Sequence, residues 1–242
     1  LERDGHTYTL VDTAGVRRRA RVKESLEKFS AIKAIQAMEA AEVVFLLIDA
    51  SEGVTDQDAR LAHLVTEAGR GVVIVVNKWD GLEPRQRDAV RRGLDLKLLT
   101  LSSFAPVLFV SALHGTNVGH LLDTADRIHT AFTQELTTNA INRVLHDATT
   151  AHPPPVRKGF RTKIRYGHQG GQRPPTIVIH GNRTEYLPKN YRKYLTNQFR
   201  RAFDLEGVPL RLELRTQENP YEGKPRGRRP RKDAKKSPGK RR

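Results

Sequence analysis

The sequence predicts a doubly wound α/β sheet over residues 1–135 and a small α+β domain over residues 136–216. In the first region, continuous apolar runs at 43–49, 72–77 and 106–111 alternate with amphipathic helical segments. Such runs are typical of parallel strands buried on both faces, and their alternation with helices is typical of a doubly wound sheet. In the second region, apolar residues alternate with basic ones, which is typical of a half-buried strand.

The first region begins with a predicted strand at 6–12, which ends at Asp12. After the 43–49 strand, Thr55 and Asp58 are spaced as a capping box and predict the start of a helix. This helix and a later one each have an apolar face with helical spacing. The two faces consist of Leu61, Leu64, Val65 and Ala68, and of Val118, Leu121, Leu122 and Ala125.

The second region has the predicted order helix, strand, strand, helix, strand, at 138–150, 160–166, 177–179, 189–203 and 210–215. In the 160–166 strand we expect a buried face of Phe160, Thr162, Ile164 and Tyr166, and a basic outer face of Arg161, Lys163 and Arg165. This outer face either contacts RNA or an acidic protein surface, or is simply solvated.

A G-x-x-G sequence occurs at Gly167–Gly170. In RNA-binding KH domains such a sequence joins two helices and clamps the nucleic-acid backbone. Here it stands between two predicted strands, so we interpret it as a hairpin loop and do not assign an RNA clamp to it.

The net charge of +16 is concentrated at the C-terminus, because Lys224–Arg242 holds 11 Lys and Arg against one acid. We expect 217–242 to be a disordered basic tail, since it mixes these charges with Pro and Gly and has no apolar period. A tail of this kind either solubilises the protein or binds polyanions such as nucleic acid.

The rest of the composition excludes several classes. Cysteine is absent, so disulfide frameworks and thiolate metal sites are excluded. No apolar run approaches the roughly 20 residues that span a bilayer, and we expect no signal peptide. The nine histidines have no metal-ligand spacing. The chain begins at Leu1 and its one methionine is Met38, so we expect it to be the C-terminal part of a longer protein.

Three polar sequences follow predicted strands of the first region, where a doubly wound sheet binds its ligands. In Asp12-Thr-Ala-Gly15, the carboxylate is suited to hold Mg²⁺ through water, and the Gly15 N–H can approach a γ-phosphate closely. In Asn77-Lys78-Trp-Asp80, the last carboxylate can accept hydrogen bonds from N1–H and the 2-amino group of guanine, a donor pair that adenine lacks.

The third sequence is Ser111-Ala112, where a small residue lets a backbone N–H reach the guanine 6-oxo group. Each sequence alone has an ordinary alternative, since Asp12, Asn77 and Asp80 are common turn residues and Ser111-Ala112 is nearly uninformative. Their order and their shared position at strand ends favour one guanine-nucleotide site over coincidence.

The D-x-x-G, N-K-x-D and S-A series resembles the translation-factor-like GTPases. The longer context is closer to one family, the Der (EngA) or double-Era-like ribosome-biogenesis GTPases. It comprises DTAGVRRRARVKESLEKFSAIKAIQAMEAAEVVFLLIDASEGVTDQD, NKWD, IVIHGN, LPKNYRKYL and ENPY. The resemblance covers about residues 1–221. It implies an N-terminally truncated P-loop-NTPase-like sheet over 1–135, followed by a KH-like domain.

The resemblance implies a cytoplasmic, ribosome-associated monomer that hydrolyses GTP to GDP in assembly of the large (50S) subunit, with rRNA as partner. It implies Mg²⁺, and a monovalent cation in the full-length family. Asp12 and Gly15 would serve Mg²⁺ and the γ-phosphate. The guanine would be held by Asn77, Lys78, Asp80, Ser111 and Ala112. The KH-like domain would contact and regulate the GTPase domain.

The sequence departs from the usual GTPase pattern in two ways that affect the expected activity. Val16 stands where many GTPases have a water-orienting glutamine, although the family is also apolar there. The 242 residues contain no G-x-x-x-x-G-K-[ST] phosphate loop, so the lysine and N–H groups that hold a β-phosphate are absent from this sequence. In this fold the first strand lies beside the strands of Asp12 and of 43–49, so we expect exposed strand edges and no GTP hydrolysis by this polypeptide alone.

A rival hypothesis is a non-catalytic rRNA-binding remnant that acts through its KH-like domain and basic tail. A tRNA-modifying GTPase relative is a weaker alternative, because those proteins usually carry a C-terminal cysteine and this chain has none.

Overall fold

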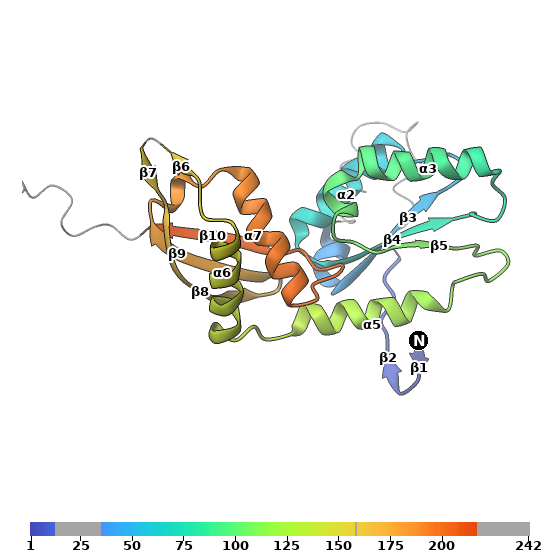
Figure 1. Cartoon of the computed structure of the whole chain (residues 1–242). Coiled ribbons are helices and arrows are strands. Elements are labelled where there is room, and N and C mark those ends of the chain that lie inside the picture. Colours follow the sequence, from blue (N-terminus) through green and yellow to red (C-terminus); the bar gives the residue numbers. More distant parts are fainter. Residues whose placement is uncertain (13–34, 158, 217–242) are drawn as a thin grey trace, which may run out of the picture.

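The computed structural model describes residues 1–12, 35–157 and 159–216 (Figure 1). The first region contains a parallel sheet of three strands in the order β3-β4-β5, with bounds Val43–Asp49, Gly71–Asn77 and Val107–Phe109. Residues 35–40 are helical, and the helices that follow are α2 (Asp56–Ala68), α3 (Pro84–Lys97), α4 (Leu99–Ser102) and α5 (His120–Thr133). Figure 1 shows α2 and α3 on one side of the sheet and α5 on the other, which confirms the doubly wound arrangement.

The central strand β4 is buried from Gly71 to Val76, as its continuous apolar run predicts. The predicted capping box at the start of α2 is confirmed: the Thr55 hydroxyl accepts from the Asp58 N–H at 3.2 Å, and the Asp58 carboxylate accepts from the Thr55 N–H at 2.8 Å. These two bonds satisfy backbone donors that the first turn of a helix otherwise leaves unpaired.

The predicted strand at 6–12 is wrong in its extent. Its first residues form β2 (His6–Thr7), which pairs antiparallel with β1 (Glu2–Arg3), and residues 8–12 form no strand. Leu10 and Val11 are 66% and 54% exposed. A strand needs a partner edge, and among the described residues β3 pairs only with β4. The short hairpin instead lies on α5, where the Tyr8 hydroxyl donates to the Asp126 carboxylate at 2.8 Å.

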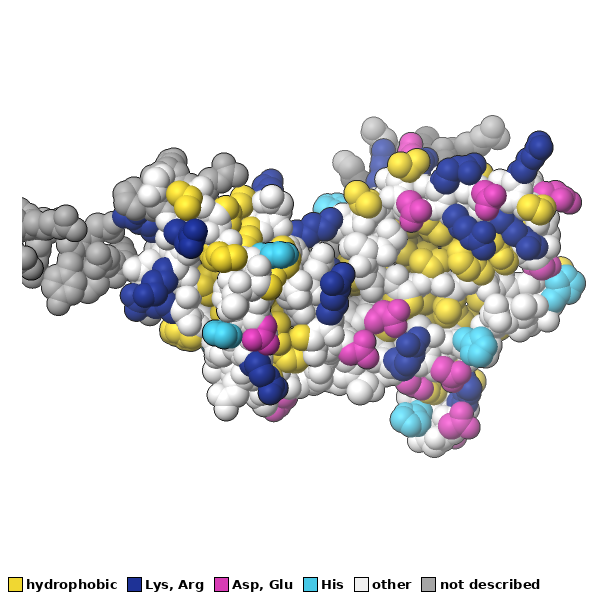
Figure 2. All heavy atoms as spheres, in the orientation of Figure 1, with side chains coloured by type: hydrophobic (Ala, Val, Ile, Leu, Met, Phe, Trp, Pro, Cys, Tyr) yellow, Lys and Arg dark blue, Asp and Glu magenta, His cyan; other side chains and the backbone are white. Residues whose placement is uncertain are grey.

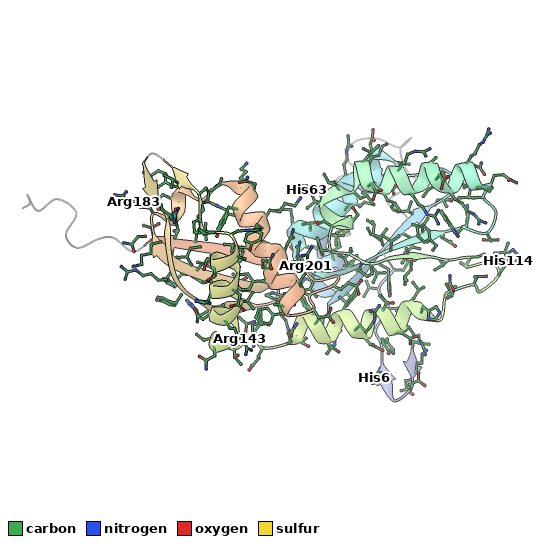
Figure 3. All side chains as sticks on the ribbon, viewed as in Figure 1. His6, His63, His114, Arg143, Arg183 and Arg201 are labelled. Carbon is green, nitrogen blue, oxygen red and sulfur yellow. The ribbon has the colours of Figure 1, made fainter. Side chains whose placement is uncertain are left out.

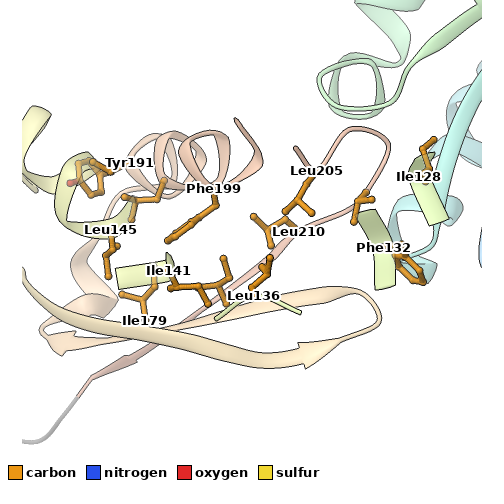
Figure 4. Close-up of a cluster of buried hydrophobic side chains, with 14 of the residues drawn as sticks. Ile128, Phe132, Leu136, Ile141, Leu145, Ile179, Tyr191, Phe199, Leu205 and Leu210 are labelled. Carbon is orange, nitrogen blue, oxygen red and sulfur yellow. The ribbon is translucent and has the colours of Figure 1, made fainter. Parts of the chain in front are cut away.

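The second region contains a three-stranded sheet in the order β10-β9-β8. β8 (Lys163–Gln172) is antiparallel to β9 (Pro175–Asn182), and β10 (Arg211–Thr216) is parallel to β9. A two-stranded ribbon, β6 (Val156–Arg157) with β7 (Phe160–Arg161), precedes the sheet. The helices are α6 (Thr138–Ala151), α7 (Lys189–Ala202) and the short η2 (Thr184–Tyr186). Figure 4 shows the apolar core lying between helices and strands.

Gly167–Gly170 does not form the predicted hairpin loop. All four residues lie inside β8, and the turn to β9 falls at Arg173-Pro174, a cis peptide. The glycines allow close packing within the domain. A Cβ on Gly167 would lie 3.1 Å from Ile141 of α6, and one on Gly170 would collide with the Val178 side chain.

The alternation predicted for 160–166 is also wrong in one place. The register slips between Ile164, which lies opposite Gly181, and Tyr166, which lies opposite His180. Arg165 is the extra residue of this bulge, and an extra residue transfers the following side chains to the other face of a sheet. Ile164 therefore packs against the core, whereas Tyr166 lies on the outer face and is 41% exposed.

One apolar core joins the two regions across residue 135. Buried residues of the first region, among them Val73, Ile128 and Phe132, belong to the same cluster as Ile141 and Phe199 of the second (Figure 4). Polar contacts reinforce this junction. The Val72 N–H donates to the Gly207 carbonyl at 2.8 Å, and the Gly207 N–H donates to the Phe104 carbonyl at 2.7 Å.

The second region therefore packs against the amino end of β4, at the opposite end of the sheet from Asn77 (Figure 1). Within the described residues, no helix is both long and apolar enough to cross a membrane.

Candidate functional site

The carboxyl ends of β3, β4 and β5 bring together most of the residues predicted to hold guanine. Asp49 at the end of β3 is in register with Asn77 at the end of β4, and Ser111 follows β5 by two residues. Parallel strands present their carboxyl ends at one edge, so side chains that are far apart in sequence become neighbours there. Figure 3 shows this end of the sheet, where His114 is labelled, far from the second region.

Asn77 connects the two loops of the site. Its Oδ1 accepts hydrogen bonds from the Lys78 N–H at 2.8 Å and from the Ala112 N–H at 3.0 Å. Lys78 has a positive φ of 63°, which turns the chain sharply after β4. The Trp79 N–H then donates to the Val110 carbonyl at 3.1 Å. These bonds fix the loop after β4 against the loop after β5.

Asp80 presents its carboxylate at the surface of these loops. The side chain is 38% exposed, and its Oδ2 lies 3.2 Å from Nε2 of His114. A hydrogen bond from Ser111 is the main cause that lowers the pKa of Asp80 below its ordinary value. The carboxylate is therefore ionised at neutral pH and can accept hydrogen bonds from a ligand.

Lys78 and Asp49 form an ion pair that the sequence reasoning missed. Lys78 Nζ lies 2.6 Å from Asp49 Oδ2, and Asp49 Oδ1 accepts from the Ser51 hydroxyl at 2.6 Å. Burial raises the pKa of Asp49, but hydrogen bonds from Lys78 and Ser51 outweigh it, so the pKa is lowered. The position of Asp49 directly after an apolar strand is the signal that could have indicated this residue.

A tilted aromatic pair with two neighbouring guanidinium groups packs against the loop after β4. The ring of Trp79 lies 4.2 Å from the ring of Phe109, and the guanidinium groups of Arg87 and Arg91 lie 5.6 and 5.3 Å from the Trp79 ring. Cations over an indole face attract it and hold it in place. Trp79 is the only tryptophan of the chain, so its fluorescence reports on this site alone.

The phosphate half of the predicted site is less complete. Asp12 is exposed and follows the short hairpin rather than a strand of the main sheet. Gly15 lies outside the described residues. No cluster of three or more acidic, histidine or cysteine side chains suited to a metal ion occurs in the part of the chain that the structure describes. The structure thus brings Asn77, Lys78, Asp80, Ser111 and Ala112 together.

Comparison with protein families gives two matches. Residues 1–131 match the elongation factor Tu GTP-binding domain, and residues 135–215 match the C-terminal KH-domain-like region of EngA bacterial GTPase enzymes.

Similar proteins include a "GTPase Der" of Methylococcus capsulatus, which is 56% identical over 93% of this chain, and a "GTPase Der" of Thioalkalivibrio sulfidiphilus, which is 54% identical over 93%. The chain spans about half, 48%, of the length of each. A solved structure of Era with MgGDPNP and a 16S ribosomal RNA segment aligns with 80% of this chain and 72% of its own, at 21% identity and a TM-score of 0.37.

Proposed function

Because the chain belongs to the GTPase Der (EngA) family, we propose that it binds guanine nucleotide at the carboxyl ends of β4 and β5. The observation that carries this proposal is the position of Asn77 Oδ1 between the Lys78 and Ala112 N–H groups. This arrangement holds an ionised carboxylate, a lysine stem and a backbone N–H in two loops at the same end of the sheet.

Each group has a distinct role in the proposal. The Asp80 carboxylate accepts from N1–H and the 2-amino group of guanine, after displacing His114. The Ala112 N–H donates to the 6-oxo group of guanine. The same N–H donates to Asn77 Oδ1 in the structure, so the 6-oxo group competes with that oxygen. The Lys78 side chain is 60% exposed and lies over the base plane when it leaves Asp49. Ser111 keeps Asp80 ionised, since their hydrogen bond lowers the pKa of Asp80.

For the phosphates, we propose that Asp12 binds Mg²⁺ through water and that Gly15 contacts the γ-phosphate. When bound, Mg²⁺ neutralises charge on the phosphates. The 242 residues offer a base site and no lysine-bearing phosphate loop, so we propose that this polypeptide by itself turns over no GTP. We propose that only the full-length protein hydrolyses GTP to GDP. There a monovalent cation takes the role of the glutamine that many GTPases have at the position of Val16.

The proposed setting is assembly of the 50S ribosomal subunit in the cytoplasm, with the protein acting as a ribosome-associated monomer. We propose that residues 1–135 are the partial second GTPase domain, that 136–216 are a KH-like domain contacting rRNA, and that 217–242 are a disordered basic tail. The shared core across residue 135 supports direct coupling of the KH-like domain to the GTPase domain.

The test uses the intrinsic fluorescence of Trp79 with nucleosides as ligands, because nucleosides probe the base site without phosphates. Guanosine should quench or shift the emission, and adenosine should not. Asp80→Asn should weaken guanosine binding by roughly 10- to 100-fold, the value of a charge-assisted hydrogen bond. The same variant should gain xanthosine binding, because the new amide N–H can donate to the 2-oxo group of xanthine.

The control is Asp95→Asn, which removes an exposed carboxylate on α3 and should leave guanosine selectivity unchanged. Equal responses to guanosine and adenosine in the unmodified chain would contradict the proposal. Phosphate release from GTP by this chain would contradict only the statement that it turns over no GTP. If the chain binds rRNA tightly and shows no guanosine response, the rival hypothesis of a non-catalytic RNA-binding remnant is correct.

A further inference from the structure

The sheet β8-β9-β10 has one face that its own helices do not use. Ile177 and Ile179 of β9 and Leu212 and Leu214 of β10 lie in or against the core. The residues between them alternate to the other face. That outer face is defined here by Lys163, Tyr166, His168, Val178, His180, Glu213 and Arg215, from their registers across the three strands.

Three rings form a stack on the outer face. The Tyr166 and His180 rings are 4.5 Å apart and inclined by 6°, and the His168 and His180 rings are 5.2 Å apart and inclined by 22°. They come from the neighbouring strands β8 and β9. The ring of Tyr166 is 41% exposed. An exposed ring that is supported from one side has its other side available for a further planar group.

The stack depends on the bulge at Arg165. Without the extra residue, Tyr166 would share the core face with Ile164, and the outer face would lose its largest ring. Bulges often re-aim a side chain at a functional position. Here the bulge places a large aromatic side chain on the outer face of a small sheet, where it gains little stability from burial.

The charges beside the stack are mostly positive. Arg215 lies next to His180 on β10, and it pairs with Glu213 at 3.3 Å. Lys163 and Arg165 are exposed on β8. Burial, with contributions from His168 and Arg215, lowers the pKa of His180. The His180 ring at the centre of the stack is therefore neutral at pH 7, and cations border the stack.

We propose that this outer face binds unpaired bases of single-stranded RNA, with a base stacked on Tyr166 and phosphates near Lys163, Arg165 and Arg215. Aromatic rings on a sheet with adjacent cations are the means by which several sheet domains hold unpaired nucleotides. The cations that border the stack, Lys163, Arg165 and Arg215, favour a polyanion that extends along the face over an acidic peptide of a few residues. The inference rests on the proposed contact with rRNA and assigns a site to it.

The experiment uses the full 242-residue chain and an eight-nucleotide RNA with one central 2-aminopurine, whose fluorescence falls when it is stacked. Binding to the unmodified chain should quench the probe. Tyr166→Leu should remove the quenching and weaken binding by roughly 5- to 100-fold, the range for one stacked base. Tyr166→Phe keeps the ring and should bind like the unmodified chain. The salt dependence should have the same slope in all three, because no charge changes.

Tyr186→Leu is the matched control, because Tyr186 on η2 is 42% exposed and lies outside the stack. It should leave both affinity and quenching unchanged. Melting curves check that each variant is folded. If Tyr166→Leu lowers only the melting temperature and binds RNA as before, the stack is a cross-strand packing feature and the inference is overturned. If the unmodified chain binds no RNA, the proposed rRNA contact fails as well.

Discussion

Nε2 of His114 lies 3.2 Å from Oδ2 of Asp80, the carboxylate that we propose to recognise guanine. The loop after β5 thus supplies a partner for Asp80 in the same place where a base would donate its hydrogens. Both side chains are well exposed, at 62% and 38%, so this contact is weak and exchangeable. It makes His114 a competitor of guanine.

Replacing His114 by alanine should therefore strengthen guanosine binding. An exposed pair is worth about 0.2–1 kcal/mol, so the gain should be about 1.5- to 5-fold. Titration of Trp79 fluorescence measures it. His120→Ala is the control, since His120 is a similarly exposed histidine 3.8 Å from Asp123. Weaker binding in His114→Ala would mean that His114 supports the base rather than competes with it.

Asn77→Ala should both weaken guanosine binding and destabilise the fold. The change removes an oxygen that accepts two backbone hydrogen bonds, and the expected loss is about 1–3 kcal/mol in the free energy of unfolding. Asn77→Asp keeps an acceptor at this position and should retain most of the stability. Urea denaturation of the three proteins measures the difference. Equal stability of the alanine and aspartate variants would show that the bridge between the loops contributes nothing.

Gly207→Ala should disrupt the junction between the two regions. Gly207 has a φ of 68°, and a Cβ there would collide with the Ile128 side chain and lie 3.0 Å from the Val72 carbonyl. Strain at positive φ and overpacking together should cost about 2–5 kcal/mol. Gly53→Ala is matched in backbone, with a φ of 71° and open space around its Cβ, and should cost only about 1–2 kcal/mol. Thermal unfolding by calorimetry compares them.

The same calorimetry tests the shared core. Because one cluster of buried side chains spans residue 135, the unmodified chain should unfold in a single transition. Two separate transitions in the unmodified chain would mean that the regions unfold independently.

Tyr191 gives a prediction for alkaline pH. Burial raises the pKa of Tyr191 to about 12, whereas the unfolded side chain titrates near pH 10. Between these values the unfolded chain has lost a proton that the folded chain keeps, so stability is present below pH 10 and is lost as the pH rises toward 12. At pH 7, Tyr191→Phe should be less stable, by about 1 kcal/mol, because it loses the hydrogen bond to the His152 carbonyl.

From pH 10 upward this difference between the unmodified chain and Tyr191→Phe should shrink, since phenylalanine does not titrate. Urea midpoints at pH 7, 9 and 10.5 measure it. Tyr186→Phe, at an exposed tyrosine, is the control for the loss of a tyrosine hydroxyl. A constant difference at all three pH values would contradict the raised pKa.

The sequence by itself determined the architecture and indicated the residues that we propose to hold guanine. The apolar run that becomes β4 is buried on both faces, so its composition identifies it without context. The run that becomes β3 has the same kind of composition, although Leu47 in it is 57% exposed. The helices α6 and α7 follow their 3.6-residue periods to within two residues of the predicted ends. Asn77, Asp80 and Ser111 were predictable because parallel strands must present their ends at one edge.

Only the tertiary structure decided the remaining features, because each depends on a partner distant in sequence. The 6–12 segment has a strand-like composition, but no edge of the described sheet accepts it, so it forms a hairpin on α5. Gly167–Gly170 resembles a loop and becomes strand because it pairs with β9, and its glycines are needed because Ile141 and Val178 leave no room for a Cβ. One bulge residue, Arg165, moves Tyr166 to the other face of the sheet. The face of a side chain depends on the pairing register, and both strands together set that register.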